Sequence, residues 1–195
     1  NWRHDVINAG MLPRRAWHLR LGMGLACAVI ALCPGCGSHS TPPLRVGMEL
    51  AYPPFEMTDK AGQPAGLSVR LAEELGRALG RRVVIENMAF DGLIPALKTG
   101  KIDCIISSMT ATAERSKSIS FSKPYMQSGL TLLAGSQSPV QGVEDLNAAG
   151  RVVAVKKGTI GHQYAIAKLP LATKLVLDKE SAAVAEVVQG KADAF

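Results

Sequence analysis

Aromatic residues are scarce in this sequence, since Phe, Trp and Tyr together make up 5% of its 195 residues. Leucine, isoleucine, valine and alanine must therefore supply most of a hydrophobic core. Hydrophobic residues still reach 47% and charged residues 19%, proportions that exclude a disordered chain and fit a globular protein. A chain of this length has room for one ordinary domain or two small lobes.

A long run of basic residues is also absent, although the formal net charge is +6. Residues 1–36 contain four arginines and one aspartate, and the rest of the chain contains 18 basic and 15 acidic residues. The positive excess is thus divided between the two parts and scattered along each. A nucleic-acid-binding protein concentrates its basic residues on one face or stripe, so the sequence argues against a nucleic-acid partner.

The apolar stretch at residues 21–33 is too short to cross a bilayer, which takes about 20 apolar residues. It follows Arg14, Arg15 and Arg20, and this order of a basic and then an apolar segment is typical of an export signal. We therefore predict that residues 1–10 are upstream or non-native sequence before Met11. Residues 11–36 are predicted to form a lipoprotein-type signal peptide, and residues 37–43 a short polar tether.

The four cysteines leave no disulfide pair. Cys27 and Cys33 fall within the predicted signal, and Cys104 lies alone in an apolar segment, which is typical of a small buried side chain. Cys36 ends a stretch that resembles the bacterial lipoprotein signal, in which the cysteine becomes lipid-modified. The alternative is an ordinary cleaved signal with a free Cys36. No Cys/His cluster has the spacing of a metal site, and we expect neither a metal nor a cofactor.

Strands and helices alternate from residue 44 onward. We predict strands at residues 44–48, 83–86 and 102–106, and helices at residues 66–79 and 92–98. Leucines recur every fourth residue in the first helix, which indicates an amphipathic helix, and Asp91 can cap the second. This β-α-β-α-β order predicts an α/β domain with a mainly parallel sheet.

The pattern restarts after a small, polar segment at residues 135–139. One more strand, at residues 130–134, is predicted before this segment. Beyond it, strands are predicted at residues 152–155 and 175–177, helices at residues 158–168 and 182–189, and a last strand begins at Ala192. We interpret residues 44–134 as one lobe and residues 135–195 as a second. Because the last strand begins so close to Phe195, we expect the second lobe to be incomplete.

Polar residues cluster in three loops after predicted strands, where open α/β sheets bind ligands. In the first loop, Tyr52 and Phe55 flank paired prolines and could form two aromatic walls. In the second, residues 107–115 combine hydroxyls, backbone N–H groups and Arg115, whose planar fork suits a carboxylate. In the third, Thr159 and the glycine before it can face an anion. The first loop also has a plainer interpretation as a turn with core aromatics, and the second as a capped helix with a solvated arginine.

Six short motifs stand in the order found in one protein family. They are Leu44-Arg45-Val46-Gly47, Tyr52-Pro53-Pro54-Phe55-Glu56, Gly92-Leu93-Ile94-Pro95-Ala96-Leu97, Gly100-Lys101-Ile102-Asp103, Thr112-Ala113-Glu114-Arg115 and Phe121-Ser122-Lys123-Pro124-Tyr125. The set resembles family 3 of the bacterial extracellular solute-binding proteins, the polar amino-acid receptors of ABC importers. The resemblance implies an α/β, periplasmic-binding-protein-like fold of type II, in which two lobes close on a ligand.

The resemblance also implies roles for nine residues. Arg115 would grip the α-carboxylate of the ligand, with help from the hydroxyl and backbone groups of Ser107, Ser108 and Thr110. The carboxylate of an amino acid would therefore be bound mainly by the loop that follows the third strand.

The remaining implied contacts surround the rest of the ligand. Tyr52 and Phe90 would sandwich it, and Thr159 would add a contact from the second lobe. Glu49 and Lys156 match positions that often meet the ligand side chain. Glu49 suits a cationic or amide group and Lys156 an acidic or amide group, so a polar ligand such as glutamine is favoured.

The sequence departs from the family pattern where the ligand ammonium is bound. The aspartate that accepts it lies just past the segment matched by residues 190–195, so the resemblance places it beyond Phe195. Asp193 matches a structural aspartate of the family and is not expected to contact the ligand.

The sequence thus predicts an exported, lipid-anchored monomer in the periplasm or on the cell surface. It would capture a polar amino acid, glutamine-like or basic, for the membrane permease of an ABC importer. Two alternatives remain open. An enzyme on the same scaffold, such as a cyclohexadienyl dehydratase or a murein lyase-associated domain, needs an acid/base pair, and Glu49 is the only obvious cleft carboxylate. A receptor sensor domain would carry a transmembrane helix elsewhere in its gene.

Overall fold

The computed structural model describes residues 41–136 and 138–195. The predicted export signal, Cys36 and most of the predicted tether lie outside the described residues. The first α/β unit contains β1 (Leu44–Met48), β2 (Ala51–Tyr52), β3 (Glu56–Thr58), β4 (Pro64–Ala65), α1 (Leu67–Ala78), β5 (Val83–Asn87), η1 (Phe90–Gly92), α2 (Leu93–Lys98), β6 (Cys104–Ile105) and α3 (Ala113–Ser116). The second α/β unit contains η2 (Val143–Leu146), β7 (Val152–Lys156), α4 (Ile160–Lys168), β8 (Thr173–Leu177) and α5 (Glu180–Val188).

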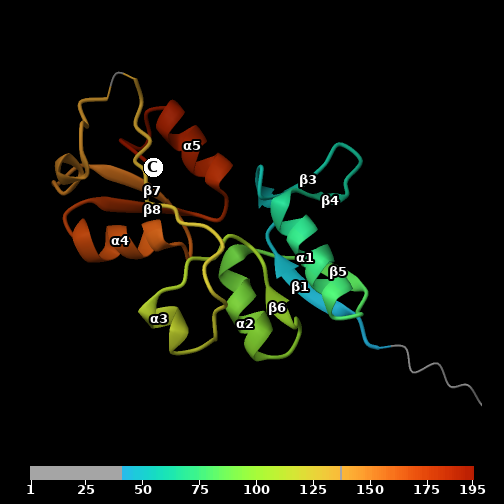
Figure 1. Ribbon diagram of the computed structural model, residues 1–195. Coiled ribbons are helices and arrows are strands. Elements are labelled where there is room, and N and C mark those ends of the chain that lie inside the picture. Colours follow the sequence, from blue (N-terminus) through green and yellow to red (C-terminus); the bar gives the residue numbers. More distant parts are fainter. Residues whose placement is uncertain (1–40, 137) are drawn as a thin grey trace, which may run out of the picture. The chain divides into compact units, whose positions relative to one another are not determined.

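β1 is the central strand of the first sheet, whose order is β5-β1-β6 with both pairs parallel. Successive side chains of a strand point to opposite faces. Val46 and Met48 pack in the cluster that includes residues of α1, whereas Gly47 faces Leu93 of α2. The two helices therefore cover opposite faces of β1, as Figure 1 shows. The predicted α/β class is confirmed.

Helix α1 lies where the leucine repeat predicts it but buries a different face. Its buried residues are Ser68, Val69, Ala72 and Gly76. The exposed leucines of the repeat are Leu67, Leu71 and Leu79. Small residues let the helix approach the sheet closely, since a Cβ at Gly76 would clash with Val83 of β5. Close packing of the backbone, rather than the bulkiest apolar stripe, sets the orientation of this helix.

A small antiparallel sheet of β2, β3 and β4 precedes α1, and the sequence analysis does not predict it. Gly66 connects β4 to α1 with φ 111° and ψ −179°, a conformation that is nearly restricted to glycine. The next two amides donate to the carbonyls of Pro54 and Phe55, at 3.3 and 2.8 Å. Gly66 thereby ties the aromatic loop after β1 to the start of α1.

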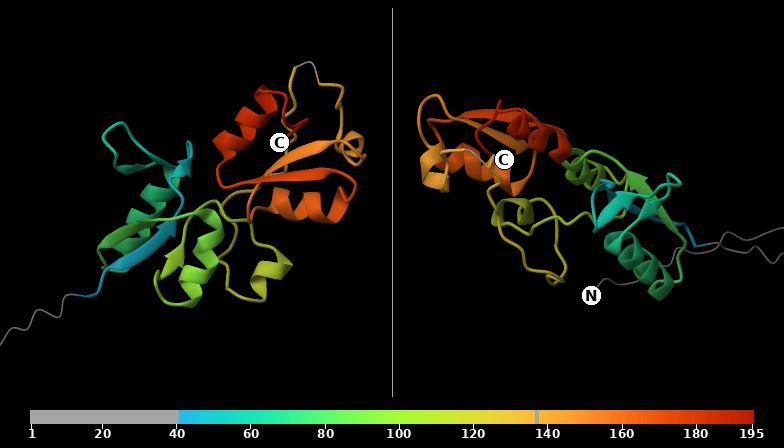
Figure 2. Two further views of the ribbon diagram at one scale, coloured as in Figure 1. Left: turned by 180° about the vertical axis from the view of Figure 1, so that it is seen from behind. Right: turned by 90° about the horizontal axis from the view of Figure 1, so that it is seen from above.

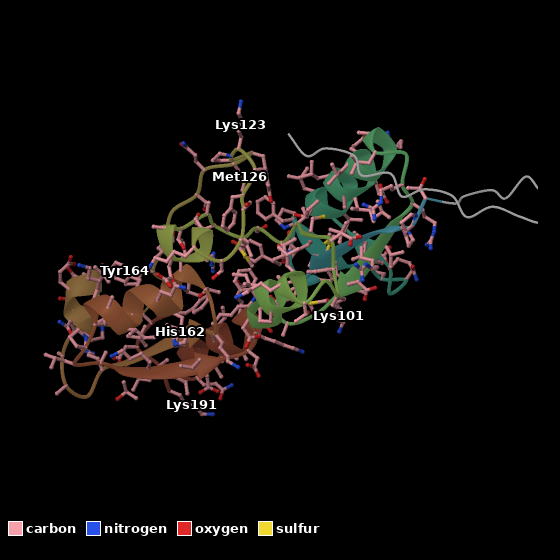
Figure 3. All side chains as sticks on the ribbon, turned by 90° about the horizontal axis from the view of Figure 1, so that it is seen from below. Lys101, Lys123, Met126, His162, Tyr164 and Lys191 are labelled. Carbon is pink, nitrogen blue, oxygen red and sulfur yellow. The ribbon has the colours of Figure 1, made fainter. Side chains whose placement is uncertain are left out.

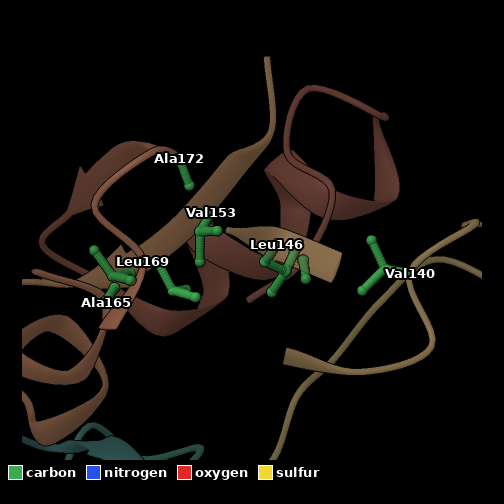
Figure 4. Packing of buried hydrophobic residues seen from close by; sticks show 8 residues of the cluster. Val140, Leu146, Val153, Ala165, Leu169 and Ala172 are labelled. Atoms are coloured by element: carbon green, nitrogen blue, oxygen red, sulfur yellow. The ribbon is translucent and has the colours of Figure 1, made fainter. Parts of the chain in front are cut away.

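The second α/β unit is built on the parallel pair β7 and β8. Val153 and Val155 pack in a cluster with Ala165 of α4, whereas Ala154 packs in another cluster with Ala183 of α5. The two helices therefore lie on opposite faces of this sheet, as the views of Figures 1 and 2 agree. Figure 4 shows how the first of these clusters fills the space beside β7.

The prediction of a strand at residues 130–134 is wrong in this structure. Leu133 instead exchanges two backbone hydrogen bonds of 2.8 Å with Phe195, and Ala134 forms an isolated bridge with Ala194. Leu130 is 53% exposed, so the apolar character of this segment does not bury it. Figure 3 shows Lys123 and Met126 on the segment between α3 and η2, whose described residues form no helix and no strand longer than an isolated bridge.

Asp91 does not cap α2 as the sequence predicts. The cap position is occupied by Gly92, and no side chain bonds to the amides there. The Asp91 carboxylate instead forms an ion pair of 2.8 Å with Lys157 of the second unit. An ammonium partner satisfies this carboxylate in place of the helix amides, and it lowers the pKa of Asp91 below its usual range.

Candidate functional site

One cavity is lined by all nine residues for which the sequence predicts a ligand contact. These are Glu49, Tyr52, Phe90, Ser107, Ser108, Thr110, Arg115, Lys156 and Thr159. Several lie just after β1, β6 and β7, at the carboxyl ends of parallel strands, where ligands bind in open α/β sheets. Direct contacts among them include the ion pair of Glu49 with Lys156, residues 107 positions apart, and the approach of Phe90 to both Arg115 and Lys156.

Arg115 is a buried cation of this cavity, with 6% of its surface exposed. Short helix α3 presents it, and Thr112 caps that helix by accepting from the Arg115 amide. The guanidinium donates to the carbonyl of Thr110 at 2.7 Å and to that of Gly158 at 2.9 Å. Burial lowers the pKa of Arg115, but a guanidinium stays charged in proteins.

The remaining donors of Arg115 suit an anion. An arginine side chain carries five N–H groups, and the two carbonyl bonds use two of them. The two carbonyls carry no full negative charge, so a carboxylate in the cavity would be the stronger partner for this cation.

The serines of the second loop hold the loop in shape. The Ser107 hydroxyl accepts from the amide of Glu49 at 3.0 Å, which links the ends of β1 and β6. Ser108 has a left-handed backbone with φ 49°, and its hydroxyl donates to Glu56 at 3.0 Å. Both hydroxyls therefore have partners within the protein, and the O–H of Ser107 and backbone N–H groups of the loop are the donors left for a ligand.

Glu56 is a buried carboxylate that the sequence analysis does not assign to the site. It is 1% exposed and accepts from Ser68 at 2.5 Å as well as from Ser108. Burial raises the pKa of Glu56 above its usual value, against the opposing effect of the two serine hydrogen bonds. These bonds make Glu56 a support of the Ser108 turn.

We expect Glu56→Gln to be more stable than the unsubstituted protein near pH 7, with the difference shrinking toward pH 4. The folded-state pKa of Glu56 lies above its ordinary 4.5, so the folded protein holds this proton more tightly than the unfolded chain. The resulting stability is complete below about pH 4.5 and is lost as the pH rises through the folded-state pKa. Urea unfolding between about pH 4 and about pH 8 measures the effect.

The control for this prediction is Glu144→Gln, because Glu144 is exposed and lies in η2, in the second unit. Its unfolding free energy should follow that of the unsubstituted protein at every pH. A Glu56→Gln curve parallel to the unsubstituted one would show that Glu56 titrates alike in both states.

The aromatic side chains of Tyr52, Phe55 and Phe90 line the cavity. Tyr52 stacks on Phe55 with ring centroids 5.7 Å apart and planes at 19°. The ring of Phe90 lies 5.5 Å from the Arg115 guanidinium carbon and also 5.5 Å from the Lys156 ammonium nitrogen. Such distances allow cation–π attraction, so Phe90 helps to hold both cations in place.

Glu49 and Lys156, the two predicted side-chain contacts, form an ion pair with each other. Their side chains are 11% and 5% exposed. Glu180, at the start of α5, lies 3.7 Å from the Lys156 ammonium and also lines the cavity. Sequence reasoning missed Glu180, although its place directly after β8, at the carboxyl end of a parallel strand, is a usable signal.

The turn after β7 contacts the first unit through three successive residues. Lys156 pairs with Glu49, Lys157 pairs with Asp91, and the Gly158 carbonyl accepts from Arg115. Thr159 follows and caps α4 by accepting from the His162 amide, while its hydroxyl donates to the Lys156 carbonyl. Like the serines, Thr159 thus uses its hydroxyl inside the protein.

The part of the chain covered by the structure holds no group of three or more His, Cys, Asp or Glu residues that could bind a metal ion. Among the same residues, no helix is both long and apolar enough to span a membrane.

Two α/β units that share a cavity at the carboxyl ends of their strands, with a buried arginine inside it, define a two-lobe binding protein of the periplasmic type. The chain belongs to the bacterial extracellular solute-binding proteins, family 3, whose family model matches residues 44–192. The predicted family and fold class are confirmed.

Curated relatives carry the names of amino-acid-binding proteins. The chain is 35% identical over 159 residues to the L-arginine-binding protein of Pseudomonas aeruginosa, covering 78% of this chain and 59% of the relative. It is 32% identical over 150 residues to the putative ABC transporter arginine-binding protein 2 of Escherichia coli, covering 77% and 60%. The chain therefore spans about 60% of the length of these relatives.

Solved structures agree with this relationship. An ancestral amino acid-binding protein, described as a precursor of cyclohexadienyl dehydratase, is 42% identical with a TM-score of 0.74, over 78% of this chain and 68% of that one. A putative ABC transporter binding component from Wolinella succinogenes, complexed with lysine, is 39% identical with a TM-score of 0.71, over 78% and 66%. At these identities the similarity supports membership of the same protein family as well as a shared fold.

Proposed function

We propose that this protein captures a polar amino acid outside the cytoplasm and delivers it to the membrane permease of an ABC importer. The observation that carries the proposal is Arg115, a buried guanidinium in a cavity between two α/β units. A cation that is buried and only partly satisfied by carbonyls is suited to the α-carboxylate that all amino acids share. The names of the relatives support an amino-acid ligand.

The polar residues that line the cavity also indicate which ligand side chains it favours. Glu49, Lys156 and Glu180 lie together in the cavity, with Phe90 beside them. Charged groups that are largely buried favour a ligand with polar atoms, because an apolar side chain would displace water from them without offering hydrogen bonds in return. The candidates are glutamine-like amino acids and the basic amino acids for which several relatives are named.

Binding without turnover fits two of the cavity carboxylates, Glu49 and Glu56, whereas Glu180 is 27% exposed and lies 3.7 Å from Lys156. Glu49 is held by Lys156, and Glu56 accepts from two serine hydroxyls. A general acid or base needs a proton position facing the substrate, and both carboxylates are directed to partners within the protein. The precursor relationship in the name of one neighbour makes dehydratase activity the alternative to test.

The proposal also includes export of the chain and its attachment to a membrane. Residues 11–36 would direct the chain out of the cytoplasm, and a lipid on Cys36 would hold the monomeric binding unit near its permease. The extracellular family supports the location.

The test is calorimetric titration of the purified chain with a panel of glutamine, arginine, lysine, histidine and glutamate, with leucine as an apolar reference. The proposal requires saturable heat with at least one polar amino acid and weaker binding of leucine. Prephenate turnover, followed by product absorbance, together with no amino-acid binding, would replace it by the enzyme alternative.

A further inference from the structure

Lys156 lies among groups that together resemble a receptor for an organic cation. Its ammonium forms an ion pair with Glu49, lies 3.7 Å from the Glu180 carboxylate and lies 5.5 Å from the centre of the Phe90 ring. Two carboxylates and an aromatic face are the partners that a guanidinium or ammonium group prefers in a protein. We call Glu49, Glu180 and Phe90 the cation pocket.

The protein fills this pocket from its own chain. Lys156 is 4% exposed, so its ammonium is enclosed rather than resting at a solvated edge. β7 delivers it from the second unit, whereas Glu49 and Phe90 belong to the first. A ligand cation that entered the pocket would have to displace a buried ammonium or lie beside it, and like charges at such distances repel strongly.

The carboxylate of Glu180 does not offset the repulsion between the Lys156 ammonium and a ligand cation. Glu180 is the more exposed of the two, at 27% of its side chain, and its contact with Lys156 is longer than a hydrogen bond. Burial raises the pKa of Glu180 above its usual value, against the opposing effect of the Lys156 charge.

We propose that Lys156 is a specificity-determining residue whose ammonium occupies the cation pocket, so that the cavity accepts amino acids with uncharged polar side chains and disfavours cationic ones. This inference rests on the proposed function and narrows it.

The chain offers a matched control in the next residue. Lys157 also links the two units, through its ion pair of 2.8 Å with Asp91, but both side chains are more exposed, at 55% and 33%. Lys157→Ala therefore removes one lysine and one ion pair between the units without opening the cation pocket. Any effect that comes from weakening the link between the units should appear in both variants.

The experiment compares the unsubstituted protein, Lys156→Ala and Lys157→Ala by calorimetric titration with glutamine and with arginine. We expect the unsubstituted protein to bind glutamine more tightly than arginine. Lys156→Ala should shift the ratio of the two affinities toward arginine by about 10-fold or more, the scale of one hydrogen bond to a charged group. Lys157→Ala should leave this ratio within about 2-fold. The double variant with Lys156→Ala and Glu180→Gln should shift the ratio toward arginine less than Lys156→Ala does.

The outcomes separate this inference from the proposed function. If no amino acid binds the unsubstituted protein, the proposed function fails. If the unsubstituted protein prefers arginine, or if Lys156→Ala leaves the ratio unchanged, amino-acid capture stands and the role of Lys156 is overturned.

A second variant covers the case in which Lys156→Ala does not fold, because it leaves Glu49 buried without its counter-ion. Lys156→Gln removes the charge but keeps a hydrogen-bond donor toward Glu49. Arginine should raise the melting temperature of Lys156→Gln more than glutamine does, and the order should be reversed in the unsubstituted protein. The same order in both proteins would overturn the inference.

Discussion

Replacing Arg115 with alanine is expected to lower amino-acid affinity by about 100-fold or more, which places binding beyond calorimetric detection. The substitution removes a buried cation of the cavity and leaves the carbonyls of Thr110 and Gly158 without their donor. A ligand carboxylate would then enter a largely buried site without its main counter-charge, and its desolvation would go uncompensated.

Two further variants make this prediction specific. Arg70→Ala removes an exposed arginine of α1 and should leave binding unchanged. Arg115→Lys keeps the charge but loses the planar fork, so we expect intermediate affinity. Full-strength binding by a folded Arg115→Ala protein, with its fold checked by circular dichroism, would mean that the ligand carboxylate is bound elsewhere.

Replacing Gly66 with alanine is expected to destabilise the fold by about 3 kcal/mol or more. Its φ of 111° and ψ of −179° are costly for any residue with a side chain. An added Cβ would also clash with the Phe55 carbonyl and lie 2.8 Å from the Pro54 carbonyl oxygen. Both obstacles are backbone atoms, so relief requires the aromatic loop to move away from α1.

Gly62 provides the comparison, because it also has a positive φ, of 78°, but a Cβ added there would meet nothing within 4 Å. Gly62→Ala should therefore cost only about 1 kcal/mol, the strain of the left-handed backbone. Chemical denaturation of both variants gives the two unfolding free energies. Equal losses at the two positions would show that contact with the aromatic loop does not contribute.

Local hydrophobic patterns predict where most helices and strands lie, but they do not predict which strands pair. The three strands of the first sheet and the helices α1, α4 and α5 appear near their predicted positions. The strand predicted at residues 130–134 rests on apolar residues alone. A strand also needs a neighbour with which to share backbone hydrogen bonds, and only Leu133 and Ala134 find one, at Phe195 and Ala194.

In the candidate site, too, a local pattern predicts individual residues but not the contacts between distant ones. A short motif is sufficient to select Arg115, and the structure places it in the cavity. Its bond to the Gly158 carbonyl joins residues 43 positions apart, and the pair of Glu49 with Lys156 spans 107 positions. Contacts of this separation depend on how the two units meet, which no local pattern encodes. The sequence therefore predicts Glu49 and Lys156 as contacts for a ligand, whereas in the structure they contact each other.

The three links made by residues 156–158 differ in how readily dissolved salt reaches them. The Lys157–Asp91 pair is solvated, so dissolved salt screens it, whereas the Lys156–Glu49 pair is enclosed and is screened much less. The outer pair should break and re-form often, whereas the enclosed pair and the bond from buried Arg115 to the Gly158 carbonyl should break rarely. If ligand release requires the two units to separate, its rate would therefore respond only weakly to ionic strength.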